Sequence, residues 1–158
     1  MADVKKNFNK REKFLTGQNQ NAILKQTAPS NDFKYTLSQS EGIQISKYIG
    51  NETSVVIPEQ IENLPVTSIG YRAFDNPDLR KVVIPESVKF IVYSAFISQQ
   101  PMHVLFKGYS IKMVSQSFLA PQITFYCARS GIVLNLRGII NNNPKCNISY
   151  RAADFDKA

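Results

Sequence analysis

The stretch VVIPESVKFIVYSAF (Val82–Phe96) decides the fold, because most of it recurs along the chain at a fixed spacing. Three copies end in Phe74, Phe96 and Phe118, which are 22 residues apart in both steps. Each phenylalanine follows a small residue, and an apolar residue lies five positions before it. A repeat of this length is typical of a solenoid in which each turn adds one short strand and a return segment.

Alternation within each copy predicts which side chains face the core, because successive strand residues point to opposite faces. Strands stacked about 4.8 Å apart would form a parallel sheet, and the repeated phenylalanines would close the far side of the core. An earlier copy runs over residues 55–74, and a degraded last strand begins 19 residues after Val104. The inward pairs are Val55 and Ile57, Val82 and Ile84, Val104 and Phe106, and Ile123 and Phe125.

The two ends of the array need caps, since the edge strands of a solenoid are otherwise open. Phe33–Leu37 and Ile43–Ile45 alternate with period two around a turn, which predicts a hairpin cap. Residues 128–158 predict a C-terminal cap or tail that includes a strand at Cys146–Tyr150. Residues 1–32 predict a basic N-terminal arm and linker with a short helix. The sequence thus predicts a mostly β chain (α+β with minor helix), with the solenoid at residues 33–127.

The motif Ile-Pro-x-x-Val-x-x-Ile-x-x-x-Ala-Phe resembles the BspA-like class of bacterial leucine-rich repeats, whose unit is about 23 residues. Residues 57–74 and 84–96 carry the resemblance, and the lead-in at 42–53 is also similar. The third unit departs from it, since Lys107 replaces the proline and Ser110 and Met113 occupy apolar positions. The resemblance implies a short leucine-rich-repeat solenoid that serves recognition or adhesion, often on bacterial cell surfaces, with no catalytic residues to carry over.

Composition and charge narrow the function classes. The 158 residues are 43% hydrophobic, which fits one globular domain. No apolar run is long enough for a membrane span, and no signal peptide is evident. The net charge of +7 is concentrated at the ends: +4 in residues 1–36 and +3 in residues 128–158. A basic arm that binds nucleic acid or an acidic protein is one interpretation, with the candidate residues Lys5, Lys6, Lys10, Arg11 and Lys13.

Groups for catalysis or metal binding are sparse. His103 is the only histidine, so no triad is predicted, and we expect it to be exposed at a strand end. One histidine and two distant cysteines do not make a zinc site, and the glycines do not cluster into a phosphate loop. The sequence therefore predicts no enzyme, no catalytic residue, no metal and no cofactor. Cys127 and Cys146 are expected either to form a disulfide or to be two buried free thiols.

The outward side of the sheet is the predicted partner-binding face. Residues that point away from the core form an apolar stripe with charged and polar flanks, and exposed apolar surface of this kind often binds a partner. Two other interpretations are that β-branched residues simply suit strands, or that a tail folds over this face. The stripe is Val56, Val83, Leu105 and Thr124, and its flanks are Lys81, His103, Lys107 and Tyr126.

Two functions follow as expectations. The first is a non-enzymatic recognition module whose sheet face binds a protein, at the cell surface or secreted if a leader was removed. The second is an intracellular accessory or inhibitor protein, cytoplasmic if Met1 is native, whose basic ends bind nucleic acid or an acidic partner. Oligomerisation is compatible with either.

Overall fold

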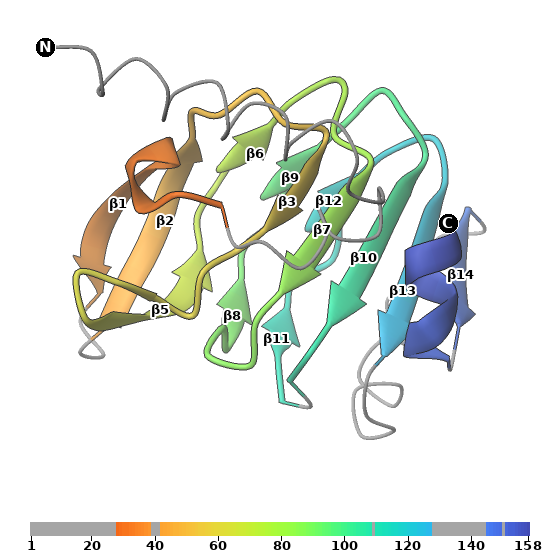
Figure 1. Ribbon diagram of the computed structural model, residues 1–158. Coiled ribbons are helices and arrows are strands. Elements are labelled where there is room, and N and C mark those ends of the chain that lie inside the picture. Colours follow the sequence, from red (N-terminus) through yellow and green to blue (C-terminus); the bar gives the residue numbers. More distant parts are fainter. Residues whose placement is uncertain (1–27, 39–41, 109, 128–144, 150) are drawn as a thin grey trace, which may run out of the picture.

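The computed structural model describes residues 28–38, 42–108, 110–127, 145–149 and 151–158, and these form a β-solenoid (Figure 1). Short strands join into coils that stack along one axis. Helix within this part of the chain is limited to the two 3-10 helices η1 (Ser30–Asp32) and η2 (Ala152–Lys157). The predicted fold class, a mostly β solenoid of stacked parallel strands, is confirmed. The helix predicted in the basic arm lies outside the described residues.

The parallel sheet that the repeats predict forms one side of the solenoid. It has five parallel strands in the order β14-β13-β10-β7-β3, and we call it the five-stranded sheet. The inward residues of β3, β7, β10 and β13 are almost completely buried, as the alternation predicts. The strands are β3 (Ser54–Val56), β7 (Lys81–Ile84), β10 (Met102–Phe106), β13 (Ile123–Cys127) and β14 (Cys146–Ser149).

The return segments differ from the prediction, because each coil contributes three strands rather than one. β6 (Phe74–Asp75), β9 (Phe96–Ile97) and β12 (Phe118–Leu119) form a three-stranded sheet. A further sheet contains β5 (Leu64–Ile69), β8 (Phe90–Ile91) and β11 (Lys112–Met113). Most of these strands have two residues, too few to show an alternating pattern in the sequence.

The N-terminal hairpin caps the array as predicted. β1 (Phe33–Ser38) pairs antiparallel with β2 (Gly42–Tyr48), and β2 pairs parallel with β5. The insertion in the first repeat forms a second hairpin, in which β4 (Gln60–Ile61) pairs antiparallel with β5. Its two turn residues, Glu62 and Asn63, have φ of 52° and 64°, as a type I′ turn requires. We call the sheet of β1, β2, β4, β5, β8 and β11 the hairpin sheet.

A ladder of phenylalanine rings fills the interior opposite the five-stranded sheet. The ring centroids of Phe74 and Phe96 are 4.7 Å apart and those of Phe96 and Phe118 are 4.6 Å apart, with interplanar angles of 16° and 6°. All three rings are buried. The chain turns into each ring through a residue with left-handed backbone, and these residues, Arg72, Ser94 and Gln116, are again spaced by 22.

The register of β13 corrects one prediction. Phe125, not Ile123, lies opposite Val104, so the last repeat step is 21 residues rather than 19. An error of two residues keeps every side chain on its predicted face, whereas an error of one would have reversed the faces. It does move the outward residues, so that Tyr126 rather than Thr124 lies opposite Leu105.

We expect Phe96→Ala to destabilise the protein by about 3–5 kcal/mol, because it removes the central ring of the ladder. Phe90→Ala is the matched control: Phe90 is in the same coil but 42% exposed, and its loss should cost less than about 1 kcal/mol. Urea unfolding of both variants measures the difference. Equal costs for the two substitutions would contradict the ladder.

Candidate binding surfaces

The outer face of the five-stranded sheet carries two rows of side chains. The strand pairing places Val56, Val83, Leu105 and Tyr126 side by side in an apolar row. Thr124, which we predicted in this row, lies instead in the neighbouring polar row. That polar row is Ser54, Lys81, His103, Thr124 and Asn147.

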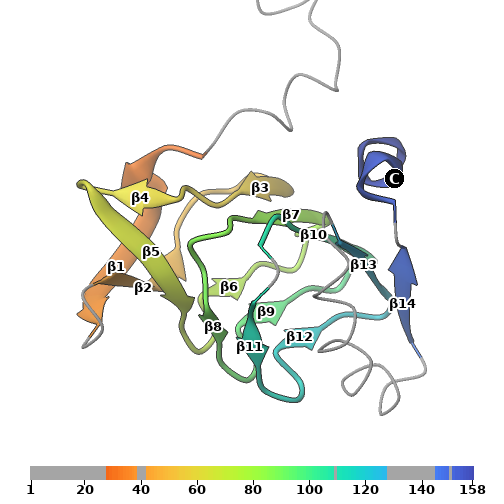
Figure 2. The ribbon, with the colours of Figure 1, turned by 90° about the horizontal axis from the view of Figure 1, so that it is seen from below.

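The apolar row is covered, so the prediction that it forms an exposed stripe is wrong. Val56, Val83 and Tyr126 are no more than 7% exposed, and Leu105 is half-buried. Part of the cover is η2, which lies on the outer side of the five-stranded sheet against β10 and β13 (Figures 1 and 2). Its Phe155 is 1% exposed and packs with the row in one apolar cluster. A tail folded over this face was one of the alternative interpretations.

Phe155 is held by an aromatic ring and by a lysine. Its ring meets that of Tyr126 in a T-shaped arrangement with centroids 5.4 Å apart. The Lys81 ammonium lies 5.7 Å from the centroid of the Phe155 ring, and donates to the Phe155 carbonyl oxygen at 3.4 Å. Lys81 thus takes part in a contact within the chain, whereas Lys107 is exposed.

His103 also differs from its prediction, since it is half-buried rather than fully exposed at the strand end. Its Nδ1 lies 2.9 Å from the Tyr126 hydroxyl. Burial, and then the charge of Lys81, lowers the pKa of His103. Burial, and then the charge of Asp154, raises the pKa of Tyr126. At neutral pH this corner of the sheet therefore holds an uncharged imidazole beside an uncharged phenol.

The two cysteines are free and buried, which settles the alternatives left by the sequence. Cys146 lies opposite Ile123 in the β13–β14 pair, four residues from Cys127. At about 3.3 Å per residue their Cα atoms are at least roughly 13 Å apart, well beyond the about 7 Å that a disulfide spans. Burial raises the pKa of the Cys127 thiol to about 11 and raises that of Cys146 as well.

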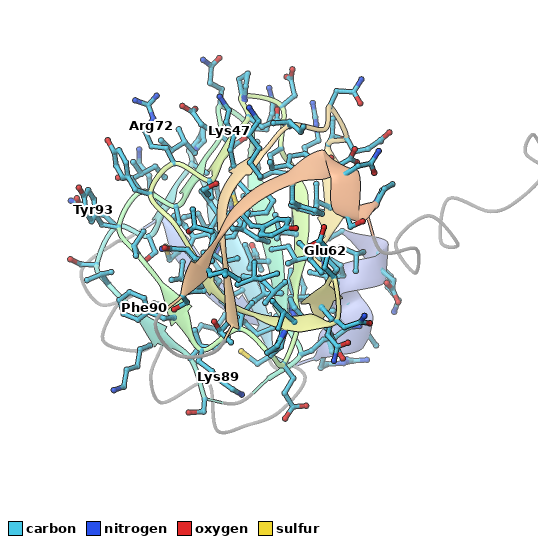
Figure 3. All side chains as sticks on the ribbon, turned by 90° about the vertical axis from the view of Figure 1, so that its left-hand side faces the viewer. Lys47, Glu62, Arg72, Lys89, Phe90 and Tyr93 are labelled. Carbon is cyan, nitrogen blue, oxygen red and sulfur yellow. The ribbon has the colours of Figure 1, made fainter. Side chains whose placement is uncertain are left out.

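A second surface, which the sequence analysis missed, is exposed on the return side of the coils. Tyr71 and Tyr93 occupy the same position in successive repeats and are 54% and 57% exposed. Their ring centroids are 5.0 Å apart. Phe90, in the same coil as Tyr93, projects from the same side of the molecule (Figure 3). We call Tyr71, Tyr93 and Phe90 the aromatic strip. The 22-residue spacing of the two tyrosines was visible in the sequence, but they lie at corners, not in the strands that the alternation identified.

Cations and a shallow hollow border the aromatic strip. The Arg72 guanidinium donates to Asp75 from both Nε and Nη2, with the Nε contact at 2.9 Å, so its side chain is held beside Tyr71. Lys47 and Lys89 are exposed, and Figure 3 shows Lys47 near Arg72 at the top of the view and Lys89 below Phe90 at the bottom. The hollow, of about 480 Å³, lies on the outer face of the hairpin sheet. Its lining residues are Ser38, Gln44, Thr67, Ser68, Lys89 and Phe90.

The described residues offer neither a metal-ligand cluster nor a membrane-spanning helix. They contain no group of three or more His, Cys, Asp or Glu side chains that could hold a metal ion. Among the same residues, no helix has the length and apolar character that crossing a membrane requires. The basic-arm residues predicted as an alternative site, Lys5 to Lys13, lie outside the described part of the chain.

We expect the stability of the protein to fall as pH decreases below the ordinary pKa of histidine, 6.5. The folded state lowers the pKa of His103, so between the two values the unfolded chain binds more protons and acid favours unfolding. His103→Gln should weaken this dependence. The measurement is the urea midpoint of both proteins at about pH 7.5 and about pH 5. An unchanged pH dependence in the variant would show that other groups cause it.

We expect neither cysteine to react quickly with a thiol reagent in the native protein, because the thiolate is the reactive form and burial disfavours it. In denaturant without reductant both thiols should react. The number of reactive thiols is measured with a chromogenic disulfide reagent before and after guanidinium is added. A denatured protein with no reactive thiol would indicate a disulfide and contradict the β13–β14 register.

Comparison with known proteins does not assign the chain to a family. No protein-family model matches the chain. No curated protein matches it either. Among solved structures, a T. pallidum leucine-rich repeat protein (TpLRR) is similar, with 17% sequence identity and a TM-score of 0.43; the match covers 68% of this chain and 78% of that one. The description of this chain as a parallel β-solenoid rests on its own strand pairing.

Proposed function

We propose that this chain is a non-enzymatic recognition module of the BspA-like leucine-rich-repeat type, and that it binds a protein partner through the aromatic strip. The observation that carries the proposal is the Tyr71–Tyr93 pair: two rings in contact with each other, each more than half exposed. Large apolar side chains that stay exposed at equivalent repeat positions do not stabilise the core. Contact with a partner would bury them.

The chemistry of the strip suits a protein surface. Tyrosine and arginine are enriched among residues that dominate protein interfaces, and tyrosine loses little side-chain freedom on binding. Arg72 is already fixed by Asp75, so it can meet a partner without further ordering. The exposed Lys89 and Lys47 place positive charge around the strip, which favours a partner with an acidic rim.

The backbone beneath the strip supports the same proposal. Tyr71 and Tyr93 each precede a residue in left-handed backbone, and each is followed three positions later by a ring of the buried ladder. The coil spacing therefore fixes the distance between the two tyrosines before any partner arrives. A preformed pair of anchors lowers the ordering cost of binding.

The cellular location is part of the proposal. The BspA-like repeat motif suggests a bacterial protein exposed at the cell surface, where a recognition module would meet its partner. The intracellular alternative depends on the basic arm, and its binding would weaken steeply with salt because phosphate or acidic side chains would supply most of it. Binding through aromatic rings would be much less sensitive to salt.

We expect the double substitution Tyr71→Ala and Tyr93→Ala to weaken partner binding by at least about tenfold and to leave the unfolding midpoint nearly unchanged. Affinity capture from the source organism supplies the partner, and titration of the purified pair measures binding by each variant. Leu37→Ala is the matched control, because Leu37 is an exposed apolar residue of the β1 strand, outside the strip.

The opposite outcome is equally specific. In that outcome, the double variant binds as well as the unmodified chain, and binding is abolished by replacing five basic residues with alanine: Lys5, Lys6, Lys10, Arg11 and Lys13. That pair of results would overturn the proposal in favour of the basic-arm function.

A further inference from the structure

The cluster around Phe155 is separate from the core of the solenoid. The core comprises the inward residues of all three sheets and the phenylalanine ladder. The Phe155 cluster contains Val56, Val83, Tyr126 and half-buried Leu105, all on the outer face of the five-stranded sheet. Removing Phe155 from this face would leave the core contacts intact. η2 therefore packs onto a solenoid whose core is complete without it.

The covering segment is held by one side chain. In residues 151–158 only Phe155 is buried, and the other residues are half-buried or exposed. The ion pairs of Asp154 with Arg151 and Lys157 stay within the segment and tie it to nothing else. A segment with one anchor opens at a small fraction of the cost of global unfolding.

We propose that this face is a peptide-binding site for a short helical turn that carries one phenylalanine, and that η2 occupies the site in cis until a partner segment of the same kind displaces it. The site lies on a different surface from the aromatic strip, so it is a second binding function and does not depend on the first. The contacts of η2, which occupies the site, indicate which chemical groups the site binds.

Three contacts define that chemistry. The apolar row with Leu105 receives the ring, and the Tyr126 ring, in a T-shaped arrangement with it, fixes its orientation. The Lys81 ammonium near the ring favours an aromatic over an aliphatic anchor, because a ring face attracts a cation. Lys81 also donates to the anchor's own carbonyl oxygen, which accepts the backbone N–H of Ala158 as well.

The site is prepared for this ligand before it arrives. The hydrogen bond between His103 and the Tyr126 hydroxyl joins two residues of the sheet and involves no atom of η2, so we expect it to hold the Tyr126 ring when η2 has left. The partner is thus a peptide with a phenylalanine in a short helical turn.

Tethering sets the strength of the competition. A segment joined to the site by a short linker acts at an effective concentration of the order of millimolar, so a free peptide competes poorly with it. Substituting Phe155 removes the cis anchor and leaves the solenoid core unchanged. The vacated site should then accept the same sequence in trans.

The test uses the full-length chain and a labelled synthetic peptide with the sequence of residues 151–158, RAADFDKA. Fluorescence anisotropy measures its binding to the unmodified chain and to Phe155→Ala. We expect at least about tenfold tighter binding to the variant, and no binding of a peptide whose own phenylalanine is replaced by alanine.

Two further substitutions in the Phe155→Ala background locate the site. Lys81→Met should weaken peptide binding by about tenfold, because it removes the ammonium from both of its contacts. Tyr93→Ala should leave peptide binding unchanged. This pair separates failure of the peptide site from failure of the aromatic strip. Peptide binding that is lost with Tyr93 and kept without Lys81 would overturn the proposal.

Two other outcomes would also overturn it: a folded Phe155→Ala variant that does not bind the peptide, or equal binding by both proteins. Hydrogen exchange on the unmodified chain keeps the proposal testable if the variant does not fold. The amides of η2 should exchange through local opening, much faster than those of β7 and β10. Exchange of η2 at the rate of these strands would mean that it leaves only on global unfolding, and the proposal would be wrong.

Discussion

Ring stacking along the solenoid axis is the contact on which the rest of the structure depends. Phe74, Phe96 and Phe118 are spaced by 4.7 and 4.6 Å, close to the 4.7–4.9 Å between hydrogen-bonded strands. The same translation from coil to coil therefore satisfies the backbone ladder and the ring contacts together. Each ring closes the core of its own coil and covers the ring of the next. A repeat without its phenylalanine would leave a void between two neighbours, which explains why the 22-residue spacing is kept while other positions vary.

The same translation also determines which side chains lie side by side on the outer surface of the solenoid. Equivalent residues of successive coils must lie next to one another, so every surface feature is a row. On the five-stranded sheet the rows are apolar and polar; at the corners, Tyr71 and Tyr93 make a shorter row. Under the proposed function, a row of exposed rings serves as a binding surface that requires no special loop. This is how a scaffold with few chemically active groups among its described residues can still be specific for a partner.

The sequence predicted the parts of this structure that repeat, and failed where a contact depends on a segment that does not repeat. The alternation of Val82–Ile84 and Val104–Phe106 identified the strands and their inward faces correctly, because both follow from local pattern. The register of β13 was wrong by two residues, since a degraded repeat leaves only the alternation, which has period two, to fix it. The packing of Phe155 on the outer face of the sheet was missed because Phe155 is a single apolar residue in a short polar segment and gives no periodic signal. The binding roles of the sheet-face residues remain a prediction.

The two proposed sites lie on opposite sides of the solenoid, with the aromatic strip on one side and η2 on the other (Figure 3). The core between them is continuous and closely packed, from the ladder to the inward faces of the five-stranded sheet. A ligand on one side therefore has no steric effect on the other, and the chain could hold two partners at once. The sites also differ in readiness. The strip is exposed, whereas the sheet face is occupied until η2 leaves. Binding to the sheet face therefore requires the free energy of displacing η2, and binding to the strip does not. On this arrangement the aromatic strip would bind first, and the sheet face would respond only to a peptide that is concentrated or held nearby.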